Sequence, residues 1–319
     1  MNPARKVVFI FGPTCVGKTE LAVRAVEGIG EIISVDSMQV YRGLDCGTAK
    51  PTDDQCKRVK HHLVSIVPPD FRFSAGDFKR RASRVIDEIY RNKMVPVLVG
   101  GTGLYFRALE YNLSEAPAAD IGLRNRLYRE EEQERGVLYR KLQEMDPETA
   151  ASVHPNDTVR IVRAIEVCVL SGRKFSDYIR ESRELNVIPL KIGITLDRQT
   201  LYERIERRCA GMISRGLAGE VYRLLRNGYD EKYPSMKGLG YSHFIQYFKG
   251  CQSYEETVRL FIRDSKRYAK RQFTWFRKEK EALWFGPGKH DRVRECIESF
   301  IGDDRGVYDV YRDNSRRQG

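Results

Sequence analysis

Short apolar runs alternate with segments of helical periodicity through the N-terminal third of the chain. Buried strands are predicted at Val7–Phe11, Glu31–Asp36 and Val95–Val99. Helices are predicted over Thr19–Val26 and from a capping box, Ser74 with Asp77, to about Arg91. Farther along, a strand at Lys191–Leu196 precedes one long amphipathic helix around Leu201–Leu225. Strands that alternate with helices predict a parallel sheet flanked by helices.

The stretch from about Ser114 to Pro189 has a different pattern. It is charged, and its apolar residues recur at helical spacing, first at Leu123, Leu127, Leu138 and Leu142 and then at Ile161, Ile165 and Val169. We therefore predict an all-helical insertion domain over 114–189 and an α/β core made of 1–113 and 190–302. The polar segment 303–319 is predicted to be a flexible tail.

Composition narrows the class of protein. The chain is 41% hydrophobic and 31% charged, which allows a sizeable core, and its net charge of +12 favours a polyanionic partner. The seven cysteines are scattered and never paired as CxxC, which indicates neither a zinc cluster nor a disulfide framework. Apolar runs are short, so we expect no membrane association and a cytoplasmic location.

A phosphate-binding pattern follows the first predicted strand. The pattern G-x-x-x-x-G-K-[ST] is matched by Gly12, Pro13, Thr14, Cys15, Val16, Gly17, Lys18 and Thr19, with a helix predicted directly after it. In such a loop, backbone N–H groups and the helix dipole attract phosphate, the lysine reaches the outer phosphates and the threonine hydroxyl holds Mg²⁺. The fold class predicted is therefore α/β, with a P-loop NTPase-like core and the helical insertion.

Two further strand ends carry candidate groups. Asp36 follows the second strand and is expected to face the same crevice as the phosphate loop. It is interpreted either as a water-mediated Mg²⁺ ligand or as a general base, and a simple turn-capping role is the structural alternative. The glycine loop Gly100–Gly103, which includes Thr102, follows the third strand and is a candidate third wall of the site.

Ser253 and Glu256 mark the start of a long helix that carries a basic cluster over Thr257–Lys280. Arg259, Arg263, Arg267 and Arg271 recur at every fourth position, with Lys266 and Lys270 beside them. Because few acidic residues accompany this stripe, we expect it to bind an external anion, RNA or DNA, through its cations and interleaved aromatic rings. A solvated face with inward aromatics is the alternative.

Taken together, these motifs resemble those of bacterial tRNA dimethylallyltransferases, also called tRNA isopentenyltransferases. They stand in the family's order from about residue 7 to 277: GPTCVGKT at 12–19, DSMQVYRGLDCGTAKP at 36–51, VLVGGTGLYFRAL from Val97, RIVRAIEV from Arg160 and AKRQFTWFR at 269–277. The chain departs from the family pattern at Cys15 and Val16, where Ala-Ser is usual, and at Cys46, where Ile is common.

The resemblance implies transfer of a dimethylallyl group from dimethylallyl diphosphate to N6 of the adenosine 3′ of the tRNA anticodon. It implies that Asp36 is the general base, that Thr102 and Lys18 assist catalysis, and that Gln39 contacts the flipped adenine. Diphosphate is assigned to the phosphate loop 12–19 and Arg208, with Mg²⁺ held by Thr19. Contacts to tRNA are assigned to Asp36, Ser37, Met38, Gln39, Thr102, Arg124, Val159, Arg160, Ile161, Val162, Arg163, Lys270, Arg271, Gln272, Thr274, Trp275, Phe276 and Arg277.

We expect a monomer whose partners are the tRNA anticodon stem-loop and dimethylallyl diphosphate. Two alternatives remain open from the sequence. A small-molecule kinase would use the same phosphate loop for ATP, with Asp36 serving a hydroxyl acceptor. A non-catalytic RNA-binding protein would retain the loop without using it.

Overall fold

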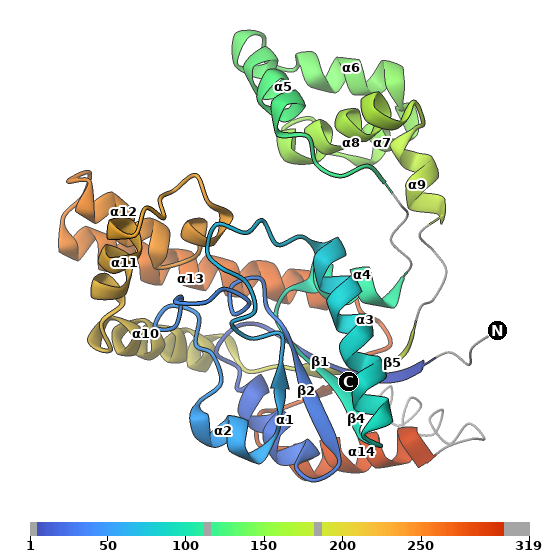
Figure 1. Ribbon diagram of the computed structural model, residues 1–319, viewed down its shortest axis with the longest axis vertical. Coiled ribbons are helices and arrows are strands. Elements are labelled where there is room, and N and C mark those ends of the chain that lie inside the picture. The colour runs from blue at the N-terminus through green and yellow to red at the C-terminus, as the bar shows by residue number, and fades with distance from the viewer. Residues whose placement is uncertain (1–4, 112–115, 182–186, 303–319) are drawn as a thin grey trace. The chain divides into compact units, whose positions relative to one another are not determined.

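The computed structural model describes residues 5–111, 116–181 and 187–302, so the predicted tail at 303–319 lies outside the described residues. Two compact units divide the chain, one formed by 1–109 with 187–319 and the other by 110–186 (Figure 1). The sequence pattern places the corresponding boundaries at 114 and 189. We call the first unit the core and the second the helical unit.

One parallel sheet of six strands, in the order β3-β2-β4-β1-β5-β6, forms the centre of the core. The strands are β1 (Arg5–Phe11), β2 (Gly30–Val35), β3 (His61–His62), β4 (Val95–Gly100), β5 (Val187–Ile194) and β6 (Leu283–Phe285). The four strands predicted from the sequence are β1, β2, β4 and β5. Strand β5 begins earlier than expected, because Val187 already pairs with Arg5 at the start of β1.

Helices cover both faces of this sheet (Figure 1). Side chains alternate along β1, so Val8 and Ile10 enter one hydrophobic cluster and Phe9 and Phe11 enter the other. The helices of the core are α1 (Lys18–Val26), α2 (Asp53–Arg58), α3 (Ala75–Arg91), α4 (Gly103–Glu110), α10 (Arg198–Ser214), α11 (Leu217–Arg226), α12 (Tyr241–Phe248), α13 (Tyr254–Phe276) and α14 (His290–Gly302), with a 3₁₀ turn, η1, at Pro234–Lys237.

Local signals account for most of the helix ends. The capping box of Ser74 and Asp77 is present at the start of α3, which ends at Arg91. The long helix predicted around 201–225 is instead two helices, because Gly216 adopts a left-handed φ of 96° between α10 and α11. Ser253 caps α13 as expected, but this helix ends at Phe276 rather than Lys280.

The described elements of the helical unit are all helices: α5 (Ile121–Gln133), α6 (Val137–Met145), α7 (Pro147–Ser152), α8 (Thr158–Ser171) and α9 (Phe175–Glu181). Leu123, Leu127, Leu138, Leu142 and Ile161 pack in its own hydrophobic core. Within the described part of the chain, the helices are too short or too polar to cross a bilayer.

Candidate active site

The loop between β1 and α1 has the backbone of a phosphate cradle. Gly12 has a φ of 152°, and a Cβ there would lie 2.3 Å from the carbonyl oxygen of Ile194. Gly17 caps α1 with a left-handed φ of 96°, so the loop leads directly into the N-terminus of that helix. Cys15 also has a positive φ, of 67°, which few non-glycine residues adopt. This loop therefore aims a helix N-terminus at the carboxyl edge of the sheet, where an anion is stabilised.

Two cations converge on this loop. The Lys18 Nζ donates a hydrogen bond to the Pro13 carbonyl oxygen at 2.7 Å. Burial, together with the neighbouring Arg208 charge, lowers the pKa of Lys18 to about 8. Arg208, on α10, contacts the Cys15 sulfur at 3.8 Å. Two cations that repel each other across one loop are suited to a ligand that carries several negative charges.

Asp36 stands at the end of β2 with its two carboxylate oxygens in different situations. Oδ1 accepts the backbone N–H of Met38 at 2.8 Å and that of Gln39 at 3.2 Å, which is the turn-capping role considered from the sequence. Within the described residues, Oδ2 has no hydrogen bond. The nearby hydroxyl of Thr102 accepts the N–H of Ser37 at 3.2 Å, so the loops that follow β2 and β4 are joined beside the carboxylate.

Two phenols lie near this carboxylate, the buried Tyr105 and the half-buried Tyr268. Burial raises the pKa of Tyr105, with further contributions from Tyr41 and Asp36. Burial and then the Asp36 charge raise the pKa of Tyr268 on α13. Both hydroxyls therefore stay protonated at neutral pH. The Asp36 charge also acts on Lys18, where it partly opposes the lowering of the pKa. The carboxylate and the phosphate cradle thus belong to one electrostatic environment.

The side chain of Gln39 is used within the protein. Its Oε1 accepts the Ser34 hydroxyl at 2.8 Å, and its Nε2 donates to the carbonyl oxygens of Thr48 at 3.3 Å and Ala49 at 2.9 Å. Because Nε2 already donates to these two carbonyl groups, the second lone pair of Oε1 is the part of this amide that remains available to an adenine. In this structure Gln39 ties the loop that follows β2 to residues 48–49.

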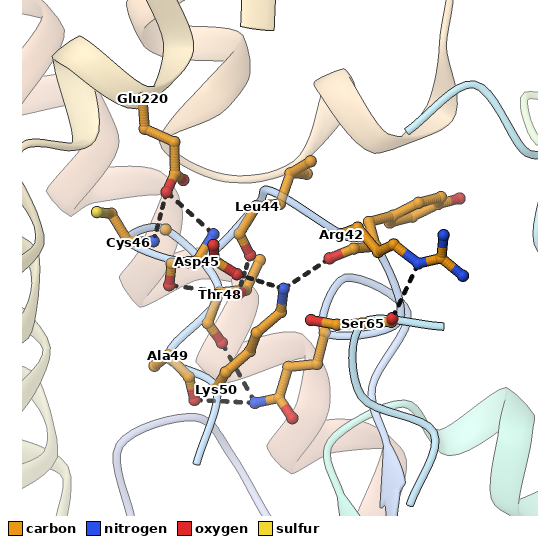
Figure 2. Close-up of polar contacts among 12 residues, drawn as sticks. Arg42, Leu44, Asp45, Cys46, Thr48, Ala49, Lys50, Ser65 and Glu220 are labelled. Atoms are coloured by element: carbon orange, nitrogen blue, oxygen red, sulfur yellow. Dashed lines mark hydrogen bonds and ion pairs between the residues drawn. The ribbon is translucent and has the colours of Figure 1, made fainter. Parts of the chain in front are cut away.

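The segment 44–50 is held by residues that the sequence analysis did not single out (Figure 2). The Glu220 carboxylate on α11 accepts the N–H groups of Asp45 at 3.1 Å and Cys46 at 2.9 Å. The Tyr241 hydroxyl donates to Glu220 at 2.6 Å and accepts the N–H of Gly47 at 3.2 Å. Nothing local in the sequence marks Glu220 or Tyr241, because their partners are distant in the chain.

Residues at the C-terminal end of α13 complete the site from inside. The Gln272 side chain accepts the N–H of Thr14 at 2.8 Å and donates to the Gly101 carbonyl oxygen at 2.9 Å. The Phe276 ring stacks on Phe11 with centroids 4.7 Å apart. Gln272 is 6% exposed and Phe276 1% exposed. Their side chains cannot contact RNA directly here, which corrects the expectation for these two residues.

The basic cluster of α13 is more neutralised than expected. Arg259 pairs with Glu256, Arg263 and Arg267 pair with Asp264, and Lys266 pairs with Glu206 of α10. The expectation that acidic partners are lacking was therefore wrong for this part of the helix. Within the described residues, Lys270, Arg271 and Arg277 have no ion pair, and these three side chains are exposed together with Thr274. The unpaired positive charge is concentrated near the end of the helix.

In the helical unit, most of the residues expected to touch RNA bond or pack with other residues of the same unit. The fully buried Glu166 carboxylate accepts two hydrogen bonds from Arg124, both at 2.8 Å, and one from Arg163 at 2.5 Å. Hydrogen bonds from both arginines lower the pKa of Glu166, against the effect of its burial. Ile161 and Val162 lie in the core of the unit, which corrects the expectation for their side chains.

Two residues at the start of α8 are the most exposed of the residues expected to touch RNA in this unit. Val159 is 68% exposed, and the Arg160 side chain is equally exposed, although it pairs with Asp157. An exposed apolar side chain beside an exposed arginine can contact a base and a phosphate.

A magnesium ion fits the donor set at the phosphate loop. Thr19 stands in the first turn of α1, and Asp36 directly follows strand β2. Among the residues that the structure describes, no group of three or more His, Cys, Asp or Glu residues is arranged to hold a metal ion. Mg²⁺ commonly binds through one or two protein oxygens, with substrate phosphates and water completing its coordination. The residues present therefore suit a metal that arrives with a diphosphate.

Comparison with known proteins agrees with this geometry. A family model described as IPP transferase matches residues 39–279. A protein named tRNA dimethylallyltransferase 2 from Geotalea uraniireducens is 48% identical over 284 residues, which are 88% of this chain and 91% of that protein. A tRNA dimethylallyltransferase from Thermotoga maritima is 41% identical over 299 residues, covering 93% of this chain and 98% of that one. These relatives favour the prenyl-transfer interpretation over the small-molecule kinase considered from the sequence.

Solved structures give the same result. The full-length tRNA isopentenylpyrophosphate transferase from Bacillus halodurans superposes with a TM-score of 0.69 at 36% identity, covering 98% of each chain. A eukaryotic dimethylallyltransferase acting on tRNA gives a TM-score of 0.77 at 24% identity, covering 95% of this chain and 82% of that one, and it shares the fold.

Proposed function

Because the chain belongs to the IPP transferase family, we propose that it transfers a dimethylallyl group from dimethylallyl diphosphate to a tRNA base. The acceptor is N6 of the adenosine 3′ of the anticodon, and diphosphate is the leaving group. The observation that carries the proposal is the convergence of Lys18, Arg208 and the Asp36 carboxylate on one carboxyl edge of the sheet.

The phosphate loop stabilises the leaving group. Backbone N–H groups at the start of α1 and the cations of Lys18 and Arg208 bind the diphosphate. They lower the barrier because negative charge grows on this group as the carbon–oxygen bond breaks. Thr19, together with the diphosphate, would hold Mg²⁺, which would neutralise part of that charge. Thr14, Cys15 and Val16 complete the cradle between Gly12 and Gly17.

Asp36 removes the proton of the acceptor. The N6 lone pair attacks the allylic carbon, the electrons of the breaking carbon–oxygen bond leave with diphosphate, and the amine proton passes to Asp36. Oδ2 suits this role because Oδ1 is already held by two backbone amides, which fix the orientation of the carboxylate. Thr102 and Ser37 keep the two loops in register beside it.

The RNA contacts the exposed groups. Lys270, Arg271 and Arg277 bind phosphates, and Thr274 lies on the same exposed surface. In the helical unit, Val159 and Arg160 are the most exposed candidates. We further propose that the protein acts as a monomer in the cytoplasm, which light scattering and fractionation test.

Mass spectrometry of an unmodified tRNA tests the proposed function. The RNA is incubated with the protein, Mg²⁺ and either dimethylallyl diphosphate or ATP. We expect a dimethylallyl mass gain on one anticodon-loop adenosine with the diphosphate and no change with ATP. Consumption of ATP without any change in the RNA would contradict the proposal and support a kinase.

A further inference from the structure

The last turns of helix α13 have an exposed side and a buried side. Its exposed side carries Lys270, Arg271 and Thr274, which face solvent. Its buried side contributes Ala269 to one hydrophobic cluster and Phe276 to the cluster on the other face of the sheet. The helix therefore passes across the carboxyl edge of the sheet, where the reacting groups stand.

Gln272 makes polar contacts between this helix and both glycine loops. Its Oε1 accepts the Thr14 N–H at 2.8 Å, and its Nε2 donates to the Gly101 carbonyl oxygen at 2.9 Å. The fit around Gly101 is tight, since a Cβ at that position would lie 2.1 Å from Nε2. One nearly buried amide thus uses its donor and its acceptor to set the spacing of the two loops.

One of these loops leads to Lys18, and the other contacts the loop that carries Asp36. From Thr14 the chain continues to Lys18 and the start of α1. From Gly101 it continues to Thr102, whose hydroxyl accepts the Ser37 N–H beside Asp36. Because Gln272 is bonded to both loops, a displacement of α13 would act on the phosphate cradle and, through Thr102 and Ser37, on the loop that carries Asp36.

The neighbouring ring of Trp275 reinforces this connection. A Cβ at Gly103 would lie 2.1 Å from the indole Nε1, so the ring rests against the first residue of α4. The Phe276 ring stacks on Phe11, the last residue of β1. These packed contacts leave α13 little freedom to shift without changing the loops.

We propose that Gln272 is a positioning residue that couples RNA binding on the exposed side of α13 to diphosphate binding in the phosphate cradle. This inference rests on the proposed function. Coupling of this kind is reciprocal: bound diphosphate tightens RNA binding by the same factor by which bound RNA tightens diphosphate binding.

The test measures RNA affinity by fluorescence anisotropy, with an unmodified anticodon stem-loop RNA in the presence of Mg²⁺. Titrations are made without and with saturating inorganic diphosphate. For the wild type we expect diphosphate to tighten RNA binding about tenfold, within the usual range of such couplings. In Gln272→Met, which keeps the length and removes both hydrogen bonds, we expect this factor to fall to about twofold or less. RNA affinity without diphosphate changes little, since Gln272 does not touch the RNA.

Gln199→Met is the matched control. Gln199 is an exposed glutamine on α10 whose amide donates to Glu203 on the same helix, so its replacement leaves the coupling factor unchanged. A second measurement covers the case in which Gln272→Met does not fold. Hydrogen exchange of the wild-type phosphate loop is followed with and without the RNA, and we expect slower exchange when RNA is bound.

Three results would overturn the inference: an equal coupling factor in wild type and Gln272→Met, no coupling in the wild type, or phosphate-loop exchange that is indifferent to RNA. Failure of the proposed function is distinguishable, because it appears as no dimethylallyl mass gain with the wild type. Normal transfer by the wild type with unchanged coupling in Gln272→Met would overturn this inference alone.

Discussion

Two replacements of Asp36 separate its two roles. In Asp36→Asn the side-chain carbonyl oxygen takes the place of Oδ1 and still accepts the N–H groups of Met38 and Gln39. The basic oxygen that faces the acceptor is absent from this variant. In Asp36→Ala both the base and the two hydrogen bonds are removed.

The magnitudes follow from these contacts. Removal of a general base slows the transfer by about 10² to 10⁴, equivalent to about 3 to 5 kcal/mol of barrier, and both variants show this slowing. The two backbone hydrogen bonds stabilise the turn by roughly 0.5 to 1.5 kcal/mol each. Asp36→Ala therefore lowers the free energy of unfolding by about 1 to 3 kcal/mol. We expect Asp36→Asn to stay near the wild type in stability.

Single-turnover transfer to the stem-loop RNA, followed by mass spectrometry, gives the rate. Urea unfolding gives the free energy of unfolding. The fluorescence signal comes from Trp275 and Trp284, which both belong to the unit that contains the sheet. A transfer rate of Asp36→Asn above about a tenth of the wild-type rate would refute the general-base role. Equal stability of Asp36→Asn and Asp36→Ala would refute the reasoning about the turn.

Three further predictions concern the charged groups. Because burial and Arg208 lower the pKa of Lys18 to about 8, the amine of the free protein loses its proton above that pH. Calorimetry should therefore find diphosphate affinity falling, and proton uptake on binding appearing, as the pH rises past about 8. Replacing Lys270 and Arg271 with Ala should weaken RNA binding. The slope of log affinity against log salt concentration should become shallower by about 0.7 to 0.9 for each RNA phosphate that is no longer neutralised. The control Arg259→Ala, which removes an arginine already paired with Glu256, should leave this slope unchanged. Glu166→Gln should destabilise the helical unit by about 2 kcal/mol, measured as faster hydrogen exchange in α8, and unaltered exchange would contradict a structural role for this carboxylate.

The sequence predicts those parts of the fold that depend on local pattern. The buried strand β1, the phosphate loop and the capping box of α3 are each defined by neighbouring residues, and each is present. Strands β3 and β6 were missed because they span only His61–His62 and Leu283–Phe285. Such short segments become strands through pairing with β2 and β5, and that pairing has no local signature.

The candidate site follows the same division. Lys18 and Asp36 could be predicted because a motif and a strand end place them. The hydrogen bonds of Gln272 and Glu220 could not be predicted, since their partners lie more than a hundred residues away. One ion pair of α13 could be predicted from the sequence, because Glu256 lies three residues before Arg259. The pairing of Lys266 with Glu206 arises only when α10 and α13 pack together.

The position of β1 in the sheet has a consequence for biosynthesis. This strand is made first, yet it lies between β4 and β5, and its partner at Val187 follows Arg5 by about 180 residues. At synthesis rates of roughly 5 to 20 residues per second, β1 waits about 10 to 40 s for that partner. During this interval the N–H and C=O groups on that edge of β1 are open to pairing with other chains, and its side chains are apolar. The helical unit, which has its own hydrophobic core, is completed during the same interval and can fold before the sheet closes. One edge of β1 therefore stays unpaired until β5 has been synthesised.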